Sequence, residues 1–544
     1  MSNKYTSPAA ADEVQASWLP MMVIALGQFL LSFNVAALPM SIGPMVNTFN
    51  TPPTTVGTAI VMYSLFVAAF IMLGAKIGQI FGARRVFQIT ALIFGGAMVL
   101  MTLSPTAGIM IAAQGIGGAT AAAMVPTFVM LIAANYKGKQ QAKALGMLGS
   151  AQAFAGLTGF LFAGFLGTWI GWRYAFAFLI PVAALMFMLS FKLESVKGRP
   201  DLRIDLVGVV LAAAAVILLS LGFNNLNRWG LLMANPAAPF NILGVSPAPL
   251  MILFGAIFGQ AFFAWSQKRE ADKKAALLAL EVISSPRERA AVMAMFMIVA
   301  LGATINFLVP LYIQIVQGRT SLQTGVAMMP YNLTIFFAAM LVVRLYETLP
   351  PRRIAQFAFC IVALGMLWLA FVIRNDWSSI PVIIGLITVG IGQGALVTLL
   401  FNVLVTSSPK EFAGDVGSLR GTVNNLAGAV GTAVAGALAV GLLSSIVLQN
   451  VVLSQKMTYE LQQQVNLDSI NFVSNDRLEG VLSNTDATPQ QVAEAVRINT
   501  ESRLRALKIA FLVFSGLALL AILPARRLPN YVPGEVPSGG APEK

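Results

Sequence analysis

The chain has no histidine among its 544 residues and a single cysteine, Cys360. The commonest zinc ligands are therefore scarce or missing, and an intramolecular disulfide cannot form. The sequence also lacks a Gly-rich loop that ends in Lys followed by Ser or Thr, the phosphate-binding element of ATP-driven pumps. We expect no catalytic residue, no metal and no cofactor, which argues against an enzyme.

Charge is also scarce. Charged residues make up 10% of the chain, whereas hydrophobic residues make up 57% and the mean hydropathy is +0.78. Because a soluble domain could not keep that much apolar surface out of water, the composition predicts an all-α polytopic membrane protein. Fourteen stretches approach the roughly 20 residues that cross a bilayer as a helix. They lie at 18–40, 55–75, 86–104, 107–135, 143–168, 173–191, 206–226, 245–266, 289–317, 322–343, 354–373, 380–406, 415–448 and 506–524.

Basic residues are unevenly divided between the loops that join these stretches. The short loops after odd-numbered stretches hold only Arg173, Arg228, Arg319 and Arg374, and the other loops hold most of the Lys and Arg. Since basic loops stay on the cytoplasmic side, we expect both termini in the cytoplasm. The net charge of +13 then reflects topology and contact with anionic membrane lipids, so no nucleic-acid partner is expected.

The sequence contains an internal repeat. In two loops a basic residue precedes an Arg pair by eight positions, as Lys76 precedes Arg84 and Arg85, and as Arg344 precedes Arg352 and Arg353. Asn34 before Pro39 in the first stretch is echoed by Asn306 before Pro310 in the ninth. Two six-helix halves account for both echoes, and such halves rock about a central site in alternating-access transporters.

The repeat gives a division of the chain. We predict a cytoplasmic segment 1–17, an N-terminal half 18–191, an inserted helix pair 192–274 with its flanking loops, a C-terminal half 275–524 that includes an outer loop 449–505, and a cytoplasmic tail 525–544.

Several motifs occur in an order typical of one transporter family. The loop from Gly74 to Arg85 resembles Gly-x-Leu-x-Asp-Arg-x-Gly-Arg-Arg, Gln114-Gly115-Ile116-Gly117 resembles Gln-Gly-x-Gly, and the run from Pro310 to Gln314 resembles Pro-Leu-Tyr-x-Gln. Trp172-Arg173 with Phe176 is similar to a Trp-Arg-x-x-Phe entry to a sixth span. The chain thus resembles the fourteen-span drug:proton antiporter branch of the major facilitator superfamily. The resemblance implies that two halves rock against each other and export small molecules.

The chain departs from this family where the family carries ionisable groups. Gln79 stands where the loop usually has Asp, Ile111 where the fourth span often has Arg, and Leu30 where many members have an acid. No apolar stretch has Asp or Glu near its middle, although a proton-coupled carrier usually needs a buried carboxylate. Proton coupling therefore stays open.

Because position 79 is Gln, the chain lacks the acid that the family places at its inner gate. We expect Asp415, Glu347 and Arg420 to supply the ion pairs of this gate instead, although an acid in the first turn of a helix is also favoured by the helix dipole alone. The predicted gate set comprises Lys76, Gln79, Arg84, Arg85, Glu347, Arg352, Arg353, Asp415 and Arg420.

Polar residues within the apolar stretches define a candidate substrate site. The candidates are Gln28, Asn34, Tyr63, Gln114, Gln152, Asn306, Tyr312, Gln314, Tyr331, Asn332, Gln393 and Asn402. Amides and phenols in hydrocarbon need partners, so each either faces a wet cavity or makes an interhelical hydrogen bond worth about 0.6 to 2 kcal/mol. A pocket of neutral amides predicts a neutral, amphipathic or anionic substrate.

Three functions are compatible with these residues. The first is a monomeric secondary transporter that exports lipophilic neutral or amphipathic small molecules. The second is a lipid or fatty-acid translocator whose cavity opens to the bilayer, and the third is a non-transporting membrane sensor or scaffold. The polar segment 449–505 is expected to cap the outer mouth, or to bind a periplasmic adaptor protein if the host has two membranes.

Overall fold

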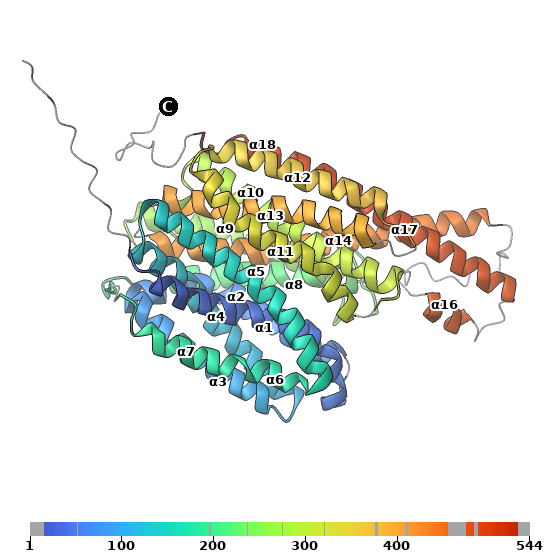
Figure 1. Ribbon diagram of the computed structural model, residues 1–544, viewed down its shortest axis with the longest axis horizontal. Helices are drawn as coiled ribbons and strands as arrows, with labels where there is room; N and C mark the ends of the chain where they lie inside the picture. Colours follow the sequence, from blue (N-terminus) through green and yellow to red (C-terminus); the bar gives the residue numbers. More distant parts are fainter. Residues whose placement is uncertain are drawn as a thin grey trace, which may run out of the picture.

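The computed structural model describes residues 16–51, 53–194, 197–236, 238–274, 276–319, 321–375, 379–408, 412–454, 475–482 and 488–530. Within these ranges the regular structure is helical, apart from two isolated β-bridges in the loop after residue 230. Fourteen helical segments of the described chain are long and apolar enough to cross a membrane, which confirms the predicted all-α polytopic fold. Figure 1 shows them gathered into one elongated bundle.

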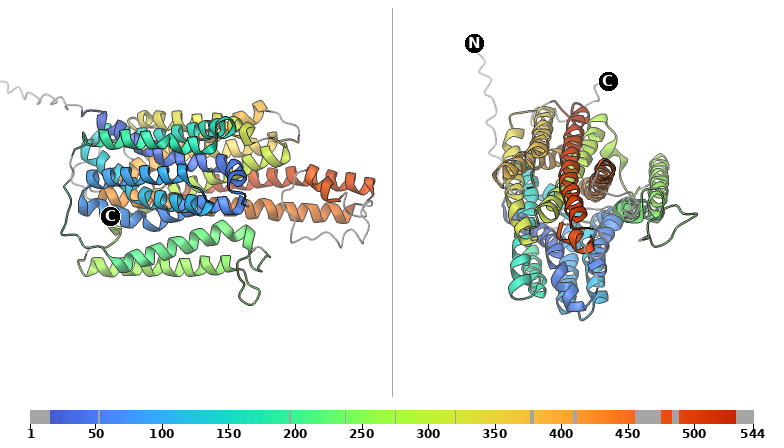
Figure 2. Two further views of the ribbon diagram at one scale, coloured as in Figure 1. Left: turned by 90° about the horizontal axis from the view of Figure 1, so that it is seen from below. Right: turned by 90° about the vertical axis from the view of Figure 1, so that its right-hand side faces the viewer.

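The first seven helices form the N-terminal half, drawn from blue to green-cyan in Figure 1. They are α1 (Leu19–Phe49), α2 (Pro53–Phe81), α3 (Ala83–Leu103), α4 (Ala107–Asn135), α5 (Gly138–Trp169), α6 (Trp172–Ala177) and α7 (Leu179–Ser190). The short α6 and the following α7 together make the sixth predicted span. Two more helices, α8 (Leu206–Trp229) and α9 (Pro247–Ala271), form the inserted pair, which Figure 2 shows at one side of the bundle.

The C-terminal half contains the remaining elements. They are the 3₁₀ turn η1 (Leu280–Ile283), α10 (Pro286–Leu311), the π-helical turn η2 (Tyr312–Val316), α11 (Ser321–Tyr346), α12 (Pro351–Val372), α13 (Ser379–Ser407), α14 (Ala413–Leu453), α16 (Asn475–Leu482), α17 (Pro489–Leu520) and α18 (Ile522–Ala525).

The predicted outer loop 449–505 is largely helical where it is described. The 41 residues of α14 span about 60 Å at 1.5 Å per residue, twice the thickness of the hydrocarbon core. The start of α17 is fixed by a capping box between Thr488 and Gln491, with Pro489 in the first turn. Figures 1 and 2 show α14 and α17 projecting together beyond the other helices. Hydrogen bonds from Asn450 to Ser502 and from Ser454 to Glu494 join the two projecting arms.

Helix packing follows the same order in the two halves. The α1–α5, α2–α4 and α3–α7 contacts of the N-terminal half correspond to the α10–α14, α11–α13 and α12–α17 contacts of the C-terminal half. The halves meet where α14 packs on α2 and α4, and where α5 packs on α11. The inserted α8 lies against α2 and α14, beside the first of these seams.

The first described helix begins, and the last described helix ends, at the same end of the bundle, which we call the termini end (Figure 2). There the Tyr136 hydroxyl, just after α4, donates to the Ser17 carbonyl at 2.9 Å and accepts from the Met21 backbone N–H at 3.0 Å. Burial raises the pKa of the Tyr136 hydroxyl, so it stays a neutral donor. On the other half, the Arg352 N–H donates to the Pro529 carbonyl.

Glycines set the separation of α2 and α4. A Cβ on Gly118 would lie 2.3 Å from the Tyr63 carbonyl oxygen, and one on Gly74 would lie 2.4 Å from the Ala122 carbonyl oxygen. Each contact is with backbone rather than with a movable side-chain tip, so any larger residue forces the two helices apart.

We expect Gly118→Val to destabilise the protein, because α2 cannot move without disturbing the rest of the N-terminal half. Overpacking of this kind costs about 1–3 kcal/mol, so the variant should unfold at a lower temperature and yield less monodisperse protein in detergent. Gly96→Ala is the matched control, since no atom lies within 4 Å of a Cβ at Gly96. Equal melting temperatures for the two variants would contradict this account.

Candidate functional site

A cavity of about 730 Å³ lies between the two halves. Its volume is within the range of small-molecule sites. The polar residues in its wall are Gln28, Ser32, Tyr63, Ser64, Gln152, Asn306, Thr324, Asn332, Arg420, Asn424 and Asn425. Leu31, Val35, Val67, Ile71, Phe160 and Met328 are among its apolar residues. Both halves therefore supply the wall, with amide groups set among aliphatic and aromatic side chains.

Five of the twelve predicted substrate-binding residues line this cavity. They are Gln28, Tyr63, Gln152, Asn306 and Asn332. Two of these amides also bond within their own helix, where Gln28 Nε2 donates to Ser32 Oγ at 2.8 Å and Asn332 Nδ2 donates to the Met328 carbonyl at 3.2 Å.

Four other candidates form two buried interhelical pairs. Asn34 and Gln114 exchange amide hydrogen bonds of 2.9 and 3.2 Å between α1 and α4. Tyr331 of α11 donates its hydroxyl to Gln393 Oε1 of α13. Neither pair lies in the cavity wall. Their polar groups are satisfied by protein, so these residues hold helices together within each half.

The last three candidates are Tyr312, Gln314 and Asn402, and none of them is among the described residues of the cavity wall. The Tyr312 hydroxyl donates to the Arg374 carbonyl at 2.8 Å, which fixes η2 to the loop after α12. The side chain of Gln314 lies outside the described residues. Asn402 is buried, and neither of its amide atoms has a hydrogen-bond partner in the described part of the chain.

The structure adds cavity residues that we did not predict there. Arg420, a predicted gate residue, and the two amides Asn424 and Asn425 all line the cavity from α14. A helix places residues four apart on one face, so the spacing of Arg420 and Asn424 in the sequence indicates that they share a polar face of α14.

Asp415 is the centre of a group of contacts between the two halves, near the termini end. Its fully buried carboxylate accepts from Lys76 Nζ at 3.1 Å and from Gln79 Nε2 at 2.7 Å, both on α2. It also accepts from the Ala279 backbone N–H, in the loop after α9, at 3.2 Å. Lys76 Nζ donates in turn to Gln79 Oε1. We call Lys76, Gln79, Ala279 and Asp415 the Asp415 cluster.

The other predicted gate residues lie away from this cluster. Arg84 donates to the Phe191 carbonyl at the end of α7, and Arg85, Glu347 and Arg353 are exposed. Arg352 is held to the C-terminal segment through its backbone. The sequence expectation that Glu347 and Arg420 join Asp415 in ion pairs has no counterpart among the described contacts.

Glycines of α14 bring the two halves close together beside the Asp415 cluster. A Cβ on Gly414 would lie 2.1 Å from Met130 Cε, and one on Gly421 would lie 1.9 Å from Ile71 Cδ1. Between them, a Cβ on Gly417 would lie 3.1 Å from the Pro126 backbone. These residues form an apolar seal between the cavity and the termini end.

The linkers of the inserted pair also reach this seal. The Arg199 N–H donates to the Gln79 carbonyl at 2.9 Å, and Gly198 lies against the Ile80 carbonyl. Ala279 belongs to the opposite linker. Both linkers are therefore part of the closure, which nothing in their polar sequence indicates.

Comparison with known proteins agrees with this architecture. The family model of the Major Facilitator Superfamily matches residues 24–432. The "Multidrug resistance protein Stp" of Mycobacterium tuberculosis strain CDC 1551 is 24% identical over 530 residues, which cover 96% of this chain and 93% of that protein. The "Cephamycin export protein CmcT" of Amycolatopsis lactamdurans is 24% identical over 420 residues, which cover 76% of this chain and 83% of that protein.

Solved structures share the fold. The human organic anion transporter MFSD10 superposes with a TM-score of 0.57 at 14% identity, covering 93% of this chain and 99% of that chain. The proton:xylose symporter XylE superposes with a TM-score of 0.56 at 12% identity, covering 93% and 94%. At these identities the likeness concerns the fold alone. The family match over most of the chain, together with the fourteen apolar helices of its described part, places this protein in the Major Facilitator Superfamily, a family of membrane transporters rather than enzymes.

Proposed function

We propose that this protein exports amphipathic small molecules by alternating access. The observation that carries the proposal is a cavity between two halves whose closure depends on contacts that cross from one half to the other. Moving α14 away from α2 and α4 breaks the Asp415 cluster and leaves the helix pairs within each half intact. The same movement exposes the cavity to the termini end.

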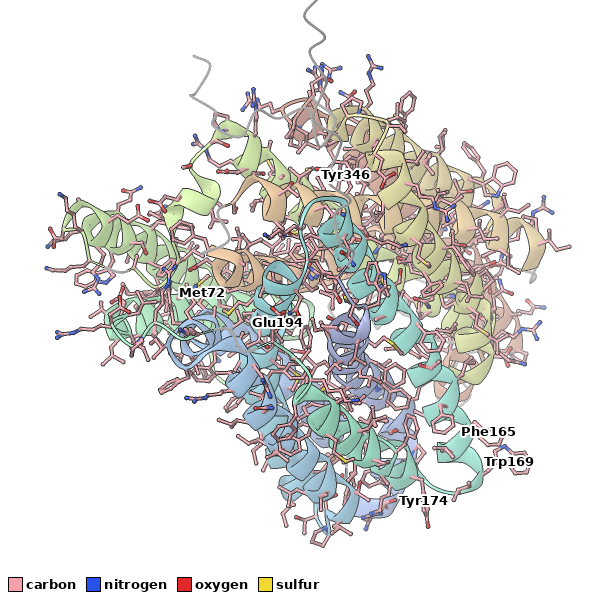
Figure 3. The ribbon with its side chains drawn as sticks, turned by 60° about the vertical axis from the view of Figure 1, so that its left-hand side comes forward. Met72, Phe165, Trp169, Tyr174, Glu194 and Tyr346 are labelled. Carbon is pink, nitrogen blue, oxygen red and sulfur yellow. The ribbon has the colours of Figure 1, made fainter. Side chains whose placement is uncertain are left out.

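The charge distribution predicts the orientation of the protein in the membrane. The positive-inside rule assigns the basic termini end to the cytoplasm. Phe165, Trp169 and Tyr174 are exposed at the other end, around the turn from α5 to α6, as expected for aromatic side chains at a membrane interface (Figure 3). With the Asp415 cluster intact, the cavity is closed to the cytoplasm. The names of the relatives, which refer to drug resistance and antibiotic export, support export as the task.

Transport does not require a second chain in this proposal. One chain supplies the cavity, the Asp415 cluster and the seal, so we propose a monomer as the transport unit. The projecting arms of α14 and α17 lie on the predicted outer side, and we propose them as the surface for an adaptor protein in a host with two membranes.

We expect Asp415→Asn to open the cytoplasmic side. Removing one partner of a buried ion pair costs about 3–5 kcal/mol, and even 1.4 kcal/mol is a tenfold change in a population. With Cys360→Ala and Val125→Cys as the reporter in the cavity wall, Asp415→Asn should raise maleimide labelling from the cytoplasmic face at least about tenfold.

Glu347→Gln is the matched control, because it removes an exposed carboxylate at the same end. It should leave the labelling rate unchanged. Equal rates in both variants would mean that the Asp415 cluster does not keep the cavity closed.

Cross-linking tests whether this closure must open during transport. Lys76→Cys with Asp415→Cys, joined by a short bis-methanethiosulfonate in a Cys360→Ala background, should stop protein-dependent transfer of Nile red from preloaded proteoliposomes to acceptor vesicles. Reducing the cross-link should restore transfer, and each single cysteine variant treated with the reagent should stay active. Transfer at the full rate in the cross-linked protein would overturn alternating access through this gate.

An imposed pH gradient should not accelerate this transfer. No Asp or Glu lines the cavity in the described part of the chain, so no group there can carry a proton between the two sides at neutral pH. Measuring Nile red transfer with and without the gradient decides the point, and acceleration by the gradient would show a proton route elsewhere in the protein.

A further inference from the structure

We propose that Arg420 forms an anion subsite in the cavity and that the preferred cargo is a lipophilic monoanion, such as an aromatic sulfonate or carboxylate. The proposal rests on the export function and names its substrate class. Arg420 is the one charged residue in the described cavity wall. Its side chain therefore sets the sign of the electrostatic potential that a substrate meets.

The guanidinium of Arg420 is buried without a balancing acid. The residue is 7% exposed, and no carboxylate lies within ion-pair distance in the described part of the chain. Its contacts are a 3.3 Å hydrogen bond to Gln152 Oε1 and the ring of Phe401, whose centroid lies 4.1 Å from the guanidinium carbon. A buried charge in a membrane protein is costly unless it is paired, and such charges mark substrate pathways. An anionic ligand would supply the missing charge.

Arg420 also retains the donors that an anion needs. A guanidinium has five N–H donors in a planar fork that fits two oxygens of a carboxylate or sulfonate. One of them is occupied by Gln152. Asn424 lies one helical turn further along α14, and its amide lines the same cavity.

The position of Arg420 separates it from the gate. Arg420 lies five positions after Asp415, and five positions turn a helix by about 500°, so the two side chains leave α14 in different directions. The carboxylate of Asp415 is already bonded to Lys76, Gln79 and Ala279. Arg420 instead bonds across to α5, at the level of the cavity. The amide of Gln152 and the ring of Phe401 carry no net charge, so these contacts leave Arg420 without a counter-ion in the described part of the chain.

The remaining wall suits an apolar body attached to the anion. Leu31, Phe160 and Met328 line the cavity together with Arg420. Aromatic and thioether side chains adapt to aromatic ligands of different shapes. One cation in an apolar wall favours substrates with a negative charge at one end, and it tolerates variation in the shape of their apolar part.

Two dyes with one scaffold test the charge preference by binding. 8-Anilinonaphthalene-1-sulfonate carries one sulfonate, and N-phenyl-1-naphthylamine lacks it. Calorimetric titration of the full chain in nanodiscs, with empty nanodiscs subtracted, should give tighter binding of the sulfonate. Arg420→Gln should weaken its binding about 10- to 100-fold, the loss of a charge-assisted hydrogen bond, and should leave N-phenyl-1-naphthylamine unchanged. Arg420→Lys should retain part of the preference.

Arg526→Gln removes an exposed arginine beyond α18 and controls for net charge. It should bind both dyes as the unaltered protein does. Unchanged sulfonate binding in Arg420→Gln, or equal weakening of both dyes, would overturn the anion subsite.

Transport separates this proposal from the export function. In Arg420→Gln, uptake of the sulfonate dye should fall by the same factor as its binding, whereas Arg526→Gln should change neither this uptake nor the transfer of Nile red. If the unaltered protein does not transfer Nile red, export is refuted. The calorimetric comparison would still decide whether Arg420 binds anions. Nile red transfer with no effect of Arg420→Gln on the sulfonate would refute the subsite alone.

Discussion

The buried carboxylate of Asp415 joins three parts of the chain that are far apart in sequence. It binds α2 through Lys76 and Gln79, and the linker between the inserted pair and the C-terminal half through Ala279. Its place in the first turn of α14 adds the favourable field of the helix N-terminus. The family resemblance places an acid on the loop of the N-terminal half, whereas here that position is Gln79 and the acid lies on the C-terminal half. The acid of this contact is therefore supplied by the C-terminal half instead of the N-terminal half, and a charged contact between the halves remains.

Hydropathy and charge predicted the number of helices and the common end of the termini because the bilayer constrains both directly. The same reasoning came close to the bounds of α14, which was predicted at 415–448 and runs from Ala413 to Leu453. It began the last span at 506, because the first turns of α17, from Pro489, are polar and resemble a loop by hydropathy. Asp415 was predicted as a gate residue because the acid of the family loop is replaced by Gln79. Lys76 and Gln79 were in the same predicted set, but the sequence could not separate them from Arg420, because helix rotation decides that Lys76 faces Asp415 while Arg420 faces the cavity.

The amide candidates illustrate a second limit. Asn34, Gln114, Tyr331 and Gln393 satisfy one another inside the halves, whereas Gln28 and Asn306 face the cavity. In sequence all six are polar groups within apolar helices, and both outcomes meet the requirement that such groups find partners. Only the relative rotation of neighbouring helices distinguishes them. Glycine positions indicate more about which helix faces pack together, because Gly118 and Gly417 are required where two backbones approach closely.

Arg420, the one cation in the described cavity wall, bears on the energy source of the carrier. A carrier that returns to its starting conformation moves no net charge of its own, so one complete cycle transfers only the charge of the cargo. An anion leaving a cell whose interior is negative moves in the direction that lowers its electrical free energy, by about 2.3 kcal/mol per 100 mV for each elementary charge. This corresponds to a concentration ratio of about 50 per 100 mV. By selecting anionic cargo, Arg420 would let the membrane potential itself drive export, and a cavity whose described wall has no carboxylate would then need no proton relay.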